Sequence, residues 1–402
     1  MNGLFEGLAV SSARSLSKMS ITSVSSDPEA ASAKSVFVIG SSARADADAS
    51  AAYEKGCRAF LTSRKAHLPK DAVILTASDA ENAADEISKK LFTMPDARFI
   101  IMTAPKGITT VGLYLTDLLY RLGDEAAFID TTGAVLTHGS TAFLEYSSAY
   151  DIRRYLFNLY SCGIRTFVTH AASPIALSSP DAEAVILNRD DCRIDSTVLM
   201  NNHPSTVLTV ADESYTVPYP PTAAMNAAGA IKYARSHGYT YDEVRIAAEH
   251  AVSRGRLQII DGTKVPCIID SARTHDDLLF VIHEYRRCFD KITVVIGSVG
   301  KYHKERRREI ADAINETAVR AILTADDPGI ESAADIANEI AAMLDVNIER
   351  TVIPDRRAAI KYAIETAGES TCVLILGKGY ENYQLIGRTK YPHDDADVAA
   401  HI

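Results

Sequence analysis

The sequence has no tryptophan and few cysteines, and this scarcity already excludes some classes of protein. Six cysteines are spread through the 402 residues with no Cys-x-x-Cys pair, at Cys57, Cys162, Cys192, Cys267, Cys288 and Cys372. Structural zinc sites and disulfide frameworks depend on closely spaced cysteines, so the pattern disfavours both. It predicts a protein of the reducing cytoplasm.

Long apolar runs and excess positive charge are also absent. No run reaches the ~18 residues of a membrane-spanning helix, and the formal net charge is -10. Non-specific nucleic-acid binding requires a basic face. We therefore expect no membrane span and no nucleic-acid partner. The first 35 residues show no basic segment before an apolar core, so we do not expect a signal peptide.

The chain does contain short apolar runs that end in glycine or acidic residues and alternate with helical patterns. Residues 98–103, 294–297, 321–325 and 371–376 have the near-continuous apolar character of strands buried in a parallel sheet. A length of 402 residues predicts two or three domains of this α/β kind. A helix is expected over residues 78–91, begun by a capping box of Ser78 and Glu81. A further helix is expected over residues 111–122.

The most informative stretch follows the last buried strand. Gly377-Lys378-Gly379-Tyr380-Glu381 places flexible backbone and two opposite charges at the carboxyl end of residues 371–376. Open α/β sheets gather their ligands at that end. The same residues would also suit a tight turn with a solvated charge pair, so this stretch alone leaves both interpretations open.

The order of the C-terminal segments resembles the C-terminal domain of the Mur ligases, in particular the MurE type. These enzymes add the third amino acid to the UDP-N-acetylmuramoyl-dipeptide of peptidoglycan. The resemblance is carried by GKGYENYQLIG at 377–387 and PHDDADVA at 392–399. It implies a three-domain α/β architecture: a small UDP-substrate-type N-terminal domain (1–97), a central P-loop-like ATPase domain (98–255) and a C-terminal Rossmann-like domain of the amino-acid-binding type (256–402).

The resemblance also implies ligands and the residues that hold them. ATP and Mg²⁺ are the expected cofactors, and a UDP-sugar peptide and an amino acid are the expected partners. By position, the nucleotide would meet Gly107, Thr109, Thr110, Asn226, Arg256 and Asp270, with Thr109 also on the metal. The amino acid would meet Asp326, Asp327, Gly377, Lys378, Gly379 and Glu381.

The phosphate-binding loop departs from the family pattern. Ala104-Pro-Lys-Gly-Ile-Thr-Thr110 stands where the family has Gly-Thr-Asn-Gly-Lys-Thr-Thr, so Ile108 takes the place of the lysine. An apolar side chain there removes the main counter-charge for the β- and γ-phosphates. Lys106 is the nearest substitute and is our candidate catalytic cation.

The magnesium ligands implied by the family are mostly replaced as well. Residues 171–175, Ala-Ala-Ser-Pro-Ile, align with the segment that carries its glutamate, and Arg193 aligns with its histidine. Arginine stays protonated and cannot bind a metal. No lysine that could be carbamylated lies between residues 196 and 231. The family's Asn-x-x-x-Asp-His-Leu-Asp segment aligns with residues 188–195, and by this resemblance Asp195 is our candidate acidic catalytic residue.

Two further departures concern the substrates. Asp27-Pro28-Glu29 stands where the family has an Asp-Ser-Arg that holds the uridine end. Asp326-Asp327-Pro328-Gly329 stands where diaminopimelate-adding members have Asp-Asn-Pro-Arg, so no arginine fork is available there for the distal carboxylate of diaminopimelate. Lysine, or another amino acid without that carboxylate, is expected instead.

Two hypotheses follow. The first is a non-catalytic or weakly active Mur ligase homologue that keeps the three-domain shape and acts with a protein partner in cell-wall synthesis. The second is an active ATP-dependent ligase with a rebuilt ATP and Mg²⁺ site and a non-diaminopimelate amino acid. The residues that would bind the phosphates and those that would bind the metal are lost together, which favours the first hypothesis. A Rossmann-type dehydrogenase is excluded because no Gly-x-Gly-x-x-Gly follows any expected strand.

Overall fold

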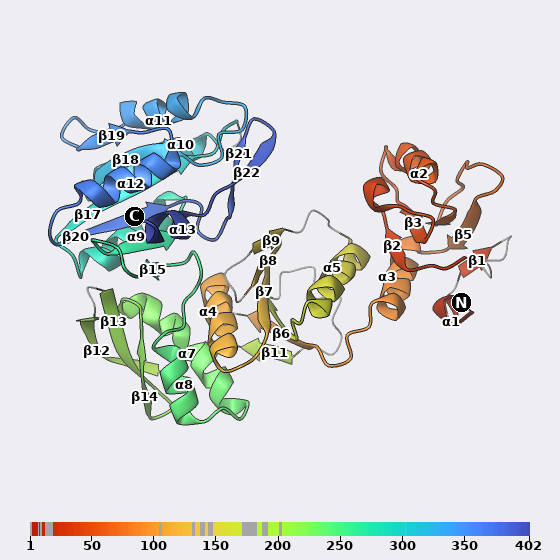
Figure 1. Ribbon diagram of the computed structural model, residues 1–402, viewed down its shortest axis with the longest axis horizontal. Coiled ribbons are helices and arrows are strands. Elements are labelled where there is room, and N and C mark those ends of the chain that lie inside the picture. The colour runs from red at the N-terminus through yellow and green to blue at the C-terminus, as the bar shows by residue number, and fades with distance from the viewer. Residues whose placement is uncertain are drawn as a thin grey trace. The chain divides into compact units, whose positions relative to one another are not determined.

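The computed structural model describes residues 2–6, 8, 10–12, 19–103, 107–130, 133–136, 141–143, 148–170, 183–186, 192–200, 203–301 and 303–402. The described chain is mixed α/β, with several separate sheets (Figure 1). It divides into two compact units. The first comprises Met1–Ile101, Asp130–Gly133 and Phe143–Glu183, and the second Met102–Ile129, Ala134–Ala142 and Ala184–Ile402. The boundaries expected after residues 97 and 255 stay predictions.

The first unit is built on a five-stranded sheet with the order β1-β5-β4-β3-β2. All neighbours are parallel except β1 and β5. Every residue of β3 is buried because its apolar side chains face helices or loops on both sides of the sheet. The strands are β1 (Val10–Ser12), β2 (Ser23–Ser25), β3 (Ser35–Ile39), β4 (Ala59–Thr62) and β5 (Val73–Ala77).

Short helices accompany this sheet: α1 (Asn2–Phe5), the 3-10 turn η1 (Pro28–Ala30), α2 (Ala45–Glu54), α3 (Ala80–Leu91) and α5 (Ala149–Ser161). The predicted capping box on α3 was wrong. Asp79 is the N-cap, and its carboxylate accepts a hydrogen bond from the Asn82 amide at 3.0 Å. Asp is as good an N-cap as Ser, and its position lets the helix bury Ala80, Ala84 and Ile87.

A further six-stranded sheet uses the central strands β6 (Arg98–Thr103), β7 (Ala126–Asp130), β8 (Gly133–Leu136), β9 (Thr141–Phe143), β10 (Thr166–His170) and β11 (Glu183–Ile186). Helix α4 (Ile108–Arg121) begins three residues before the predicted start, residue 111. A separate antiparallel meander joins β12 (Cys192–Met200), β13 (His203–Val210) and β14 (Glu213–Val217). The helices α7 (Pro221–Ser236) and α8 (Tyr241–Ala248) follow.

The C-terminal sheet has the order β15-β16-β20-β17-β18-β19, and all neighbours are parallel except β15 and β16. Its strands are β15 (Gln258–Ile260), β16 (Cys267–Asp270), β17 (Lys291–Ser298), β18 (Arg320–Ala325), β19 (Arg350–Val352) and β20 (Thr371–Leu376). The helices of this part are α9 (His275–Arg286), α10 (Glu305–Thr317), α11 (Ala333–Ala342), α12 (Arg356–Thr366) and α13 (Asp395–Ala400). A two-stranded hairpin, β21 (Tyr383–Ile386) and β22 (Thr389–Pro392), stands apart from the sheet.

The expected buried strands of this sheet are confirmed, and residues 371–376 have the bounds of β20. One face is covered by α12 and α13, whose Ile360, Ile364 and Val398 pack on Ile269 and Ile375 of the strands. The carboxyl ends of β16, β18 and β20 therefore meet along one edge, which brings Asp270, Asp326 and Gly377 to the same side of the sheet. None of the described helices combines the length and the apolar character that crossing a membrane requires.

Candidate functional site

A pocket of about 450 Å³ opens in the second unit between the start of α4 and the start of α9. The six residues predicted to contact nucleotide line it together. Its lining consists of Gly107, Ile108, Thr109, Thr110, Thr222, Asn226, Arg256, Leu257, Asp270, Asp277, Phe280 and Val281.

The α4 side of this pocket is shaped to receive an anion. Gly107 is the N-cap of α4 with φ +73°, and a Cβ there would come within 3.1 Å of the Asn226 side-chain oxygen. Glycine thus permits both the left-handed turn and the close approach. The first amides of a helix have no partner within the helix and favour a negative group. Ile108 is the first residue of α4 and lines the pocket where the family resemblance places a lysine.

The opposite side is organised by Asp270, the last residue of β16. Its two carboxylate oxygens accept hydrogen bonds from the amides of Ala272 at 2.7 Å and Leu257 at 2.8 Å. Burial raises the pKa of this carboxyl, and the neighbouring Arg256 guanidinium opposes that shift. Leu257 has φ +49°, so Asp270 also holds a backbone conformation that a leucine rarely adopts.

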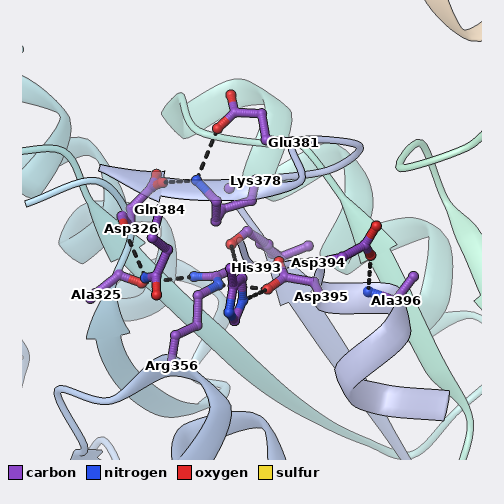
Figure 2. A network of polar contacts seen from close by, with 12 residues as sticks. Ala325, Asp326, Arg356, Lys378, Glu381, Gln384, His393, Asp394, Asp395 and Ala396 are labelled. Carbon is purple, nitrogen blue, oxygen red and sulfur yellow. Dashed lines mark hydrogen bonds and ion pairs between the residues drawn. The ribbon is translucent and has the colours of Figure 1, made fainter. Parts of the chain in front are cut away.

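A second set of predicted residues forms a cluster of charges at the ends of β18 and β20. The Lys378 ammonium lies 2.9 Å from Asp327, 3.0 Å from Glu381 and 3.4 Å from Asp326 (Figure 2). Burial by itself would lower the pKa of Lys378, but the carboxylates of Asp326, Glu381 and Asp327 outweigh it and raise that pKa. The carboxylates thus favour the charged form of the buried Lys378 side chain.

The glycines beside Lys378 are needed for the fold of this loop. Gly377 and Gly379 have φ +106° and +55°. A Cβ on Gly379 would lie 2.6 Å from the Cβ of Ser271 and 2.7 Å from the carbonyl oxygen of Gly255. The loop thus packs directly on the segment that leads to Arg256 and the nucleotide-type pocket.

Next to the charge cluster, the buried Arg356 side chain forms a network of hydrogen bonds (Figure 2). Its guanidinium binds the Asp395 carboxylate at 2.6 and 2.7 Å and donates to the carbonyls of Ala325 at 3.1 Å and Leu376 at 2.9 Å. His393 contacts the same carboxylate at 2.8 Å. Ala325 and Leu376 immediately precede Asp326 and Gly377, so the hydrogen bonds of Arg356 link the two strand ends that carry the cluster.

Arg273 completes the cluster from a third strand end, three residues beyond β16. Its Nε donates to the carbonyl of Gly377 at 2.6 Å, and its Nη2 pairs with Glu381. Burial would lower the pKa of this guanidinium, but Asp326 and Glu381 raise it. The sequence analysis assigned Arg273 no role.

The remaining predicted residues lie elsewhere. Lys106 falls outside the described residues, so its predicted role stays a prediction. Asp195 lies in β12, where it pairs with Arg193 at 3.0 Å and accepts from Thr209 at 2.6 Å, and it is not among the residues that line the pocket. Arg307 of α10 is buried and pairs with Glu331 and Glu339.

No described residue of the pocket lining belongs to a group of acidic, cysteine or histidine side chains that could share a metal ion. Within the described part of the chain, three acidic groups that could share a metal come together at Asp326, Asp327 and Glu381. The ammonium of Lys378 already contacts all three carboxylates, so this group does not suit a divalent cation. Among the described residues that line the pocket, Arg256 is the one cation.

Sequence reasoning missed Arg356, Asp277 and Phe280. A signal existed for Arg356, because a cation in the first turn of a helix opposes the helix dipole and needs a compensating anion. Asp277 and Phe280 lie in the first two turns of α9, and nothing local distinguishes them from other helix-surface residues.

Comparison with known proteins finds a family model and relatives that match part of this chain. Residues 255–379 match the family model described as "Mur ligase, glutamate ligase domain". A 2,6-diaminopimelate-adding UDP-N-acetylmuramoyl-L-alanyl-D-glutamate ligase of Aquifex aeolicus is 34% identical over 180 residues, covering 44% of this chain and 37% of that protein. The UDP-N-acetylmuramyl-tripeptide synthetase of Lactobacillus delbrueckii subsp. bulgaricus is 36% identical over 172 residues, covering 42% and 33%. The matched segments thus span about a third of the relatives' length.

Solved structures are similar in fold to this chain over more of its length. The structure of a UDP-N-acetylmuramoyl-L-alanyl-D-glutamate–2,6-diaminopimelate ligase matches with a TM-score of 0.53 and 18% identity, covering 95% of this chain and 94% of that one. MurF ligase of Thermotoga maritima in complex with ADP matches with a TM-score of 0.58 and 13% identity, covering 89% and 94%. These likenesses confirm the predicted fold class, an α/β chain of Mur ligase architecture.

Proposed function

We propose that this chain, whose residues 255–379 form a Mur ligase C-terminal domain, is a MurE-like protein of peptidoglycan precursor synthesis with little or no ligase turnover. The family context is supported by the relatives, which are named as ligases or synthetases of UDP-N-acetylmuramoyl peptides. The proposed class of ligands is therefore a nucleotide in the pocket and an amino acid near Lys378.

The observation that carries the proposal of low turnover is Ile108 at the start of α4, in the lining of the nucleotide-type pocket. Ligation through an acyl phosphate brings a carboxylate against a triphosphate, so cations must neutralise the developing charge. An isoleucine supplies none. Among the described lining residues, the carboxylates of Asp270 and Asp277 outnumber the single guanidinium of Arg256, which further disfavours a triphosphate.

In the proposed role the residues of this chain bind and orient more than they catalyse. The amides at the start of α4 receive a phosphate, and the Asn226 side chain lies next to Gly107 in the pocket lining. Asp270 keeps the backbone at Arg256 and Leu257 in place. Magnesium and ATP, where the family requires them, would supply charge neutralisation and the transferred phosphoryl group.

Calorimetric titration with Mg-ATP tests this proposal. We expect the parent to bind ATP no better than the millimolar range. The variant Ile108→Lys should gain about tenfold or more, since one charge-assisted hydrogen bond contributes about 1.5–3 kcal/mol. The matched control is Ile246→Lys, because Ile246 is 54% exposed on α8 and lies outside the pocket lining. That variant should bind as weakly as the parent.

Micromolar binding by the parent, together with ATP-dependent amide formation from an amino acid, would overturn the proposal. It would instead establish the alternative, an active ligase in which Lys106 or another cation replaces the loop lysine. Equal gains in Ile108→Lys and Ile246→Lys would show that added charge, and not its position, improves binding.

A further inference from the structure

A second pocket, of about 520 Å³, lies in the second unit, and its described lining shares no residue with that of the nucleotide-type pocket. Three segments form its walls: one face of β13 and β14, the turn that follows α8, and the loop between β15 and β16. Small-molecule sites usually have volumes of about 300–1,000 Å³. The pocket is therefore large enough to hold an organic ligand.

The strand face of this pocket presents two hydroxyls that have no hydrogen-bond partner in the described chain, those of Ser205 in β13 and Thr216 in β14. Ser205 is only 7% exposed, yet neither oxygen is one of the fully enclosed unpartnered atoms of the described chain, so both are open to the pocket. Val207 pairs with Thr216 across the two strands, which puts Ser205 and Thr216 on the same face, diagonal to each other. Buried polar groups nearly always have a partner. These two hydroxyls thus indicate a place for a ligand group that forms hydrogen bonds.

The loop between β15 and β16 adds an unpaired carboxylate, that of Asp261. Turn aspartates commonly accept hydrogen bonds from nearby backbone amides. Asp261, however, is exposed and forms neither a hydrogen bond nor an ion pair with a described residue. Other polar groups of the loop are already engaged, because the Thr263 hydroxyl donates to the Val265 carbonyl at 2.7 Å and the Lys264 ammonium to the Glu365 carbonyl at 3.3 Å. Asp261 is therefore the group of this loop that is available to a ligand.

The charges of the pocket favour a ligand with a positive group. Apart from His250, the described charged residues of the lining are two carboxylates, Asp261 and Glu249, and one ammonium, Lys264. Glu249 lies 3.5 Å from the Arg245 guanidinium, so Asp261 is the carboxylate without a cation. The chain as a whole has a formal charge of -10, which also attracts cations. An anion such as phosphate is disfavoured by the same charges.

The lining also excludes other classes of ligand. Its described residues include no Phe, Tyr or Trp on which a nucleobase or a sugar could stack. A divalent metal ion needs several oxygen ligands around one point, and within the described chain the groups that could share an ion come together elsewhere, at Asp326, Asp327 and Glu381. Aliphatic residues form the apolar part of the wall, which suits an alkyl chain. They are Val252, Val265, Ile259, Pro218 and Pro266.

We propose that this pocket binds an aliphatic primary amine that carries a neutral hydrogen-bonding group at its far end. The ammonium binds the Asp261 carboxylate, the alkyl chain packs on the aliphatic wall, and the neutral group binds the hydroxyls of Ser205 and Thr216. The inference goes beyond the proposed function and does not depend on it, because this pocket and the nucleotide-type pocket have no described lining residue in common.

Three probes of the same chain length separate the contributions of the two ends: 5-amino-1-pentanol has both the ammonium and the hydroxyl, pentylamine lacks the hydroxyl, and 1,5-pentanediol lacks the ammonium. Ligand-observed NMR titrations of the full chain measure their affinities. We expect 5-amino-1-pentanol to bind about tenfold more tightly than 1,5-pentanediol, for one charge-assisted hydrogen bond. It should bind about threefold more tightly than pentylamine, for one neutral hydrogen bond.

Variants then assign each end of the ligand. Asp261→Asn should weaken the binding of both amines about tenfold and leave that of 1,5-pentanediol unchanged. Asp212→Asn is the matched control, since it removes the same charge from an exposed residue in the turn between β13 and β14, outside the lining, and should bind all three probes as the parent does. Ser205→Ala should weaken the binding of 5-amino-1-pentanol about threefold and leave that of pentylamine unchanged. Circular dichroism and thermal melting verify that each variant is folded.

Equal affinities of the parent for 5-amino-1-pentanol and 1,5-pentanediol would overturn this inference, and so would an absence of binding by all three probes. A folded Asp261→Asn variant that binds the amines as tightly as the parent, or an equal loss in Asp212→Asn, would also overturn it. Equal affinities for the two amines would overturn the part assigned to the hydroxyls. No nucleotide is present in these titrations, so their outcome is independent of the tests with Mg-ATP.

Discussion

At the scale of the residue, Arg356 shows how one buried charge organises a site that it does not enter. Its donors satisfy the carbonyls at the ends of β18 and β20 and the carboxylate of Asp395. Both charged side chains are fully buried. Such a pair is stabilising only while both partners are present, because a lone buried charge loses its hydration without compensation.

We therefore predict that Arg356→Met destabilises the protein by about 3–5 kcal/mol. The loss comes from leaving Asp395 buried beside His393 alone and from freeing the carbonyls of Ala325 and Leu376. Urea unfolding followed by circular dichroism measures it. The adjacent Arg357→Met is the matched control, since Arg357 is exposed and should change stability by less than about 0.5 kcal/mol.

The pair of Arg356 and Asp395 also predicts that the stability of the folded protein depends on pH. Burial would raise the pKa of Asp395, but Arg356 and His393 outweigh it and lower that pKa below the ordinary value of 3.8. A lowered carboxyl pKa gives stability that is complete above the ordinary value and lost as the pH falls through the folded one. The difference between the parent and Arg356→Met should thus be constant at neutral pH and shrink below about pH 4. A difference that stays constant down to about pH 2 would contradict this.

At the scale of the element, the loop after β20 and the segment before β15 fit together through glycine. A Cβ on Gly255 would lie 2.1 Å from the amide nitrogen of Tyr380, and Gly255 also has φ +62°. Gly379 faces the carbonyl of Gly255 in turn. The contact joins the segment of Arg256 to the loop of Lys378 with no room for a side chain.

Gly255→Ala should destabilise the protein by at least about 3 kcal/mol, because strain of the left-handed backbone adds to the overlap with Tyr380. Gly262→Ala separates the two causes. Gly262 has φ +80° but no atom within 4 Å of a Cβ, so only the backbone strain of about 1–2 kcal/mol should remain. Equal losses in the two variants, measured by urea unfolding, would show that the close contact does not matter.

At the scale of the whole molecule, the cysteines report on burial in both units. Cys57 of the first unit and Cys267 and Cys372 of the second are buried, Cys192 and Cys288 are intermediate and Cys162 is exposed. Burial raises the pKa of the Cys267 thiol to about 11 and that of Cys372 well above its usual range. Thiolate is the reactive form, so the buried cysteines should be inert in the folded state.

We predict that one thiol reacts rapidly with a disulfide reagent such as Ellman's reagent and that this phase disappears in Cys162→Ser. Three thiols should react only in guanidinium, since they require unfolding. Counting the thiols released with and without denaturant measures this. Rapid reaction of more than three thiols in the folded protein would contradict the described cores.

Part of the fold and of the candidate site could be predicted from the sequence because its signals are local. Apolar runs identified β18 and β20, and the carboxyl ends of parallel strands meet at one edge. The acidic residues after β18 and the Lys378 loop after β20 could therefore be expected together from the order of the residues alone. Gly107, Thr109, Thr110 and Asn226 were placed by resemblance, and they line one pocket.

The start of α3 shows the limit of such local signals. Ser78 with Glu81 has the pattern of a capping box, yet Asp79 caps the helix. Ser78 and Asp79 have nearly equal capping strength, and their positions differ by about 100° around the helix axis. Asp79 is the N-cap because Ala84 and Ile87 then pack on the core of the first unit.

The sequence alone determined which strands are buried, where they end and which charges stand at those ends, because these depend on residue type and short-range pattern. Only the tertiary structure decided what the long cationic side chains contact. Arg273 reaches Gly377 and Glu381 more than 100 residues away, and Arg356 reaches carbonyls on two strands that are separated by β17. The partners of a guanidinium depend on the strand order, and no local pattern in the chain encodes that order.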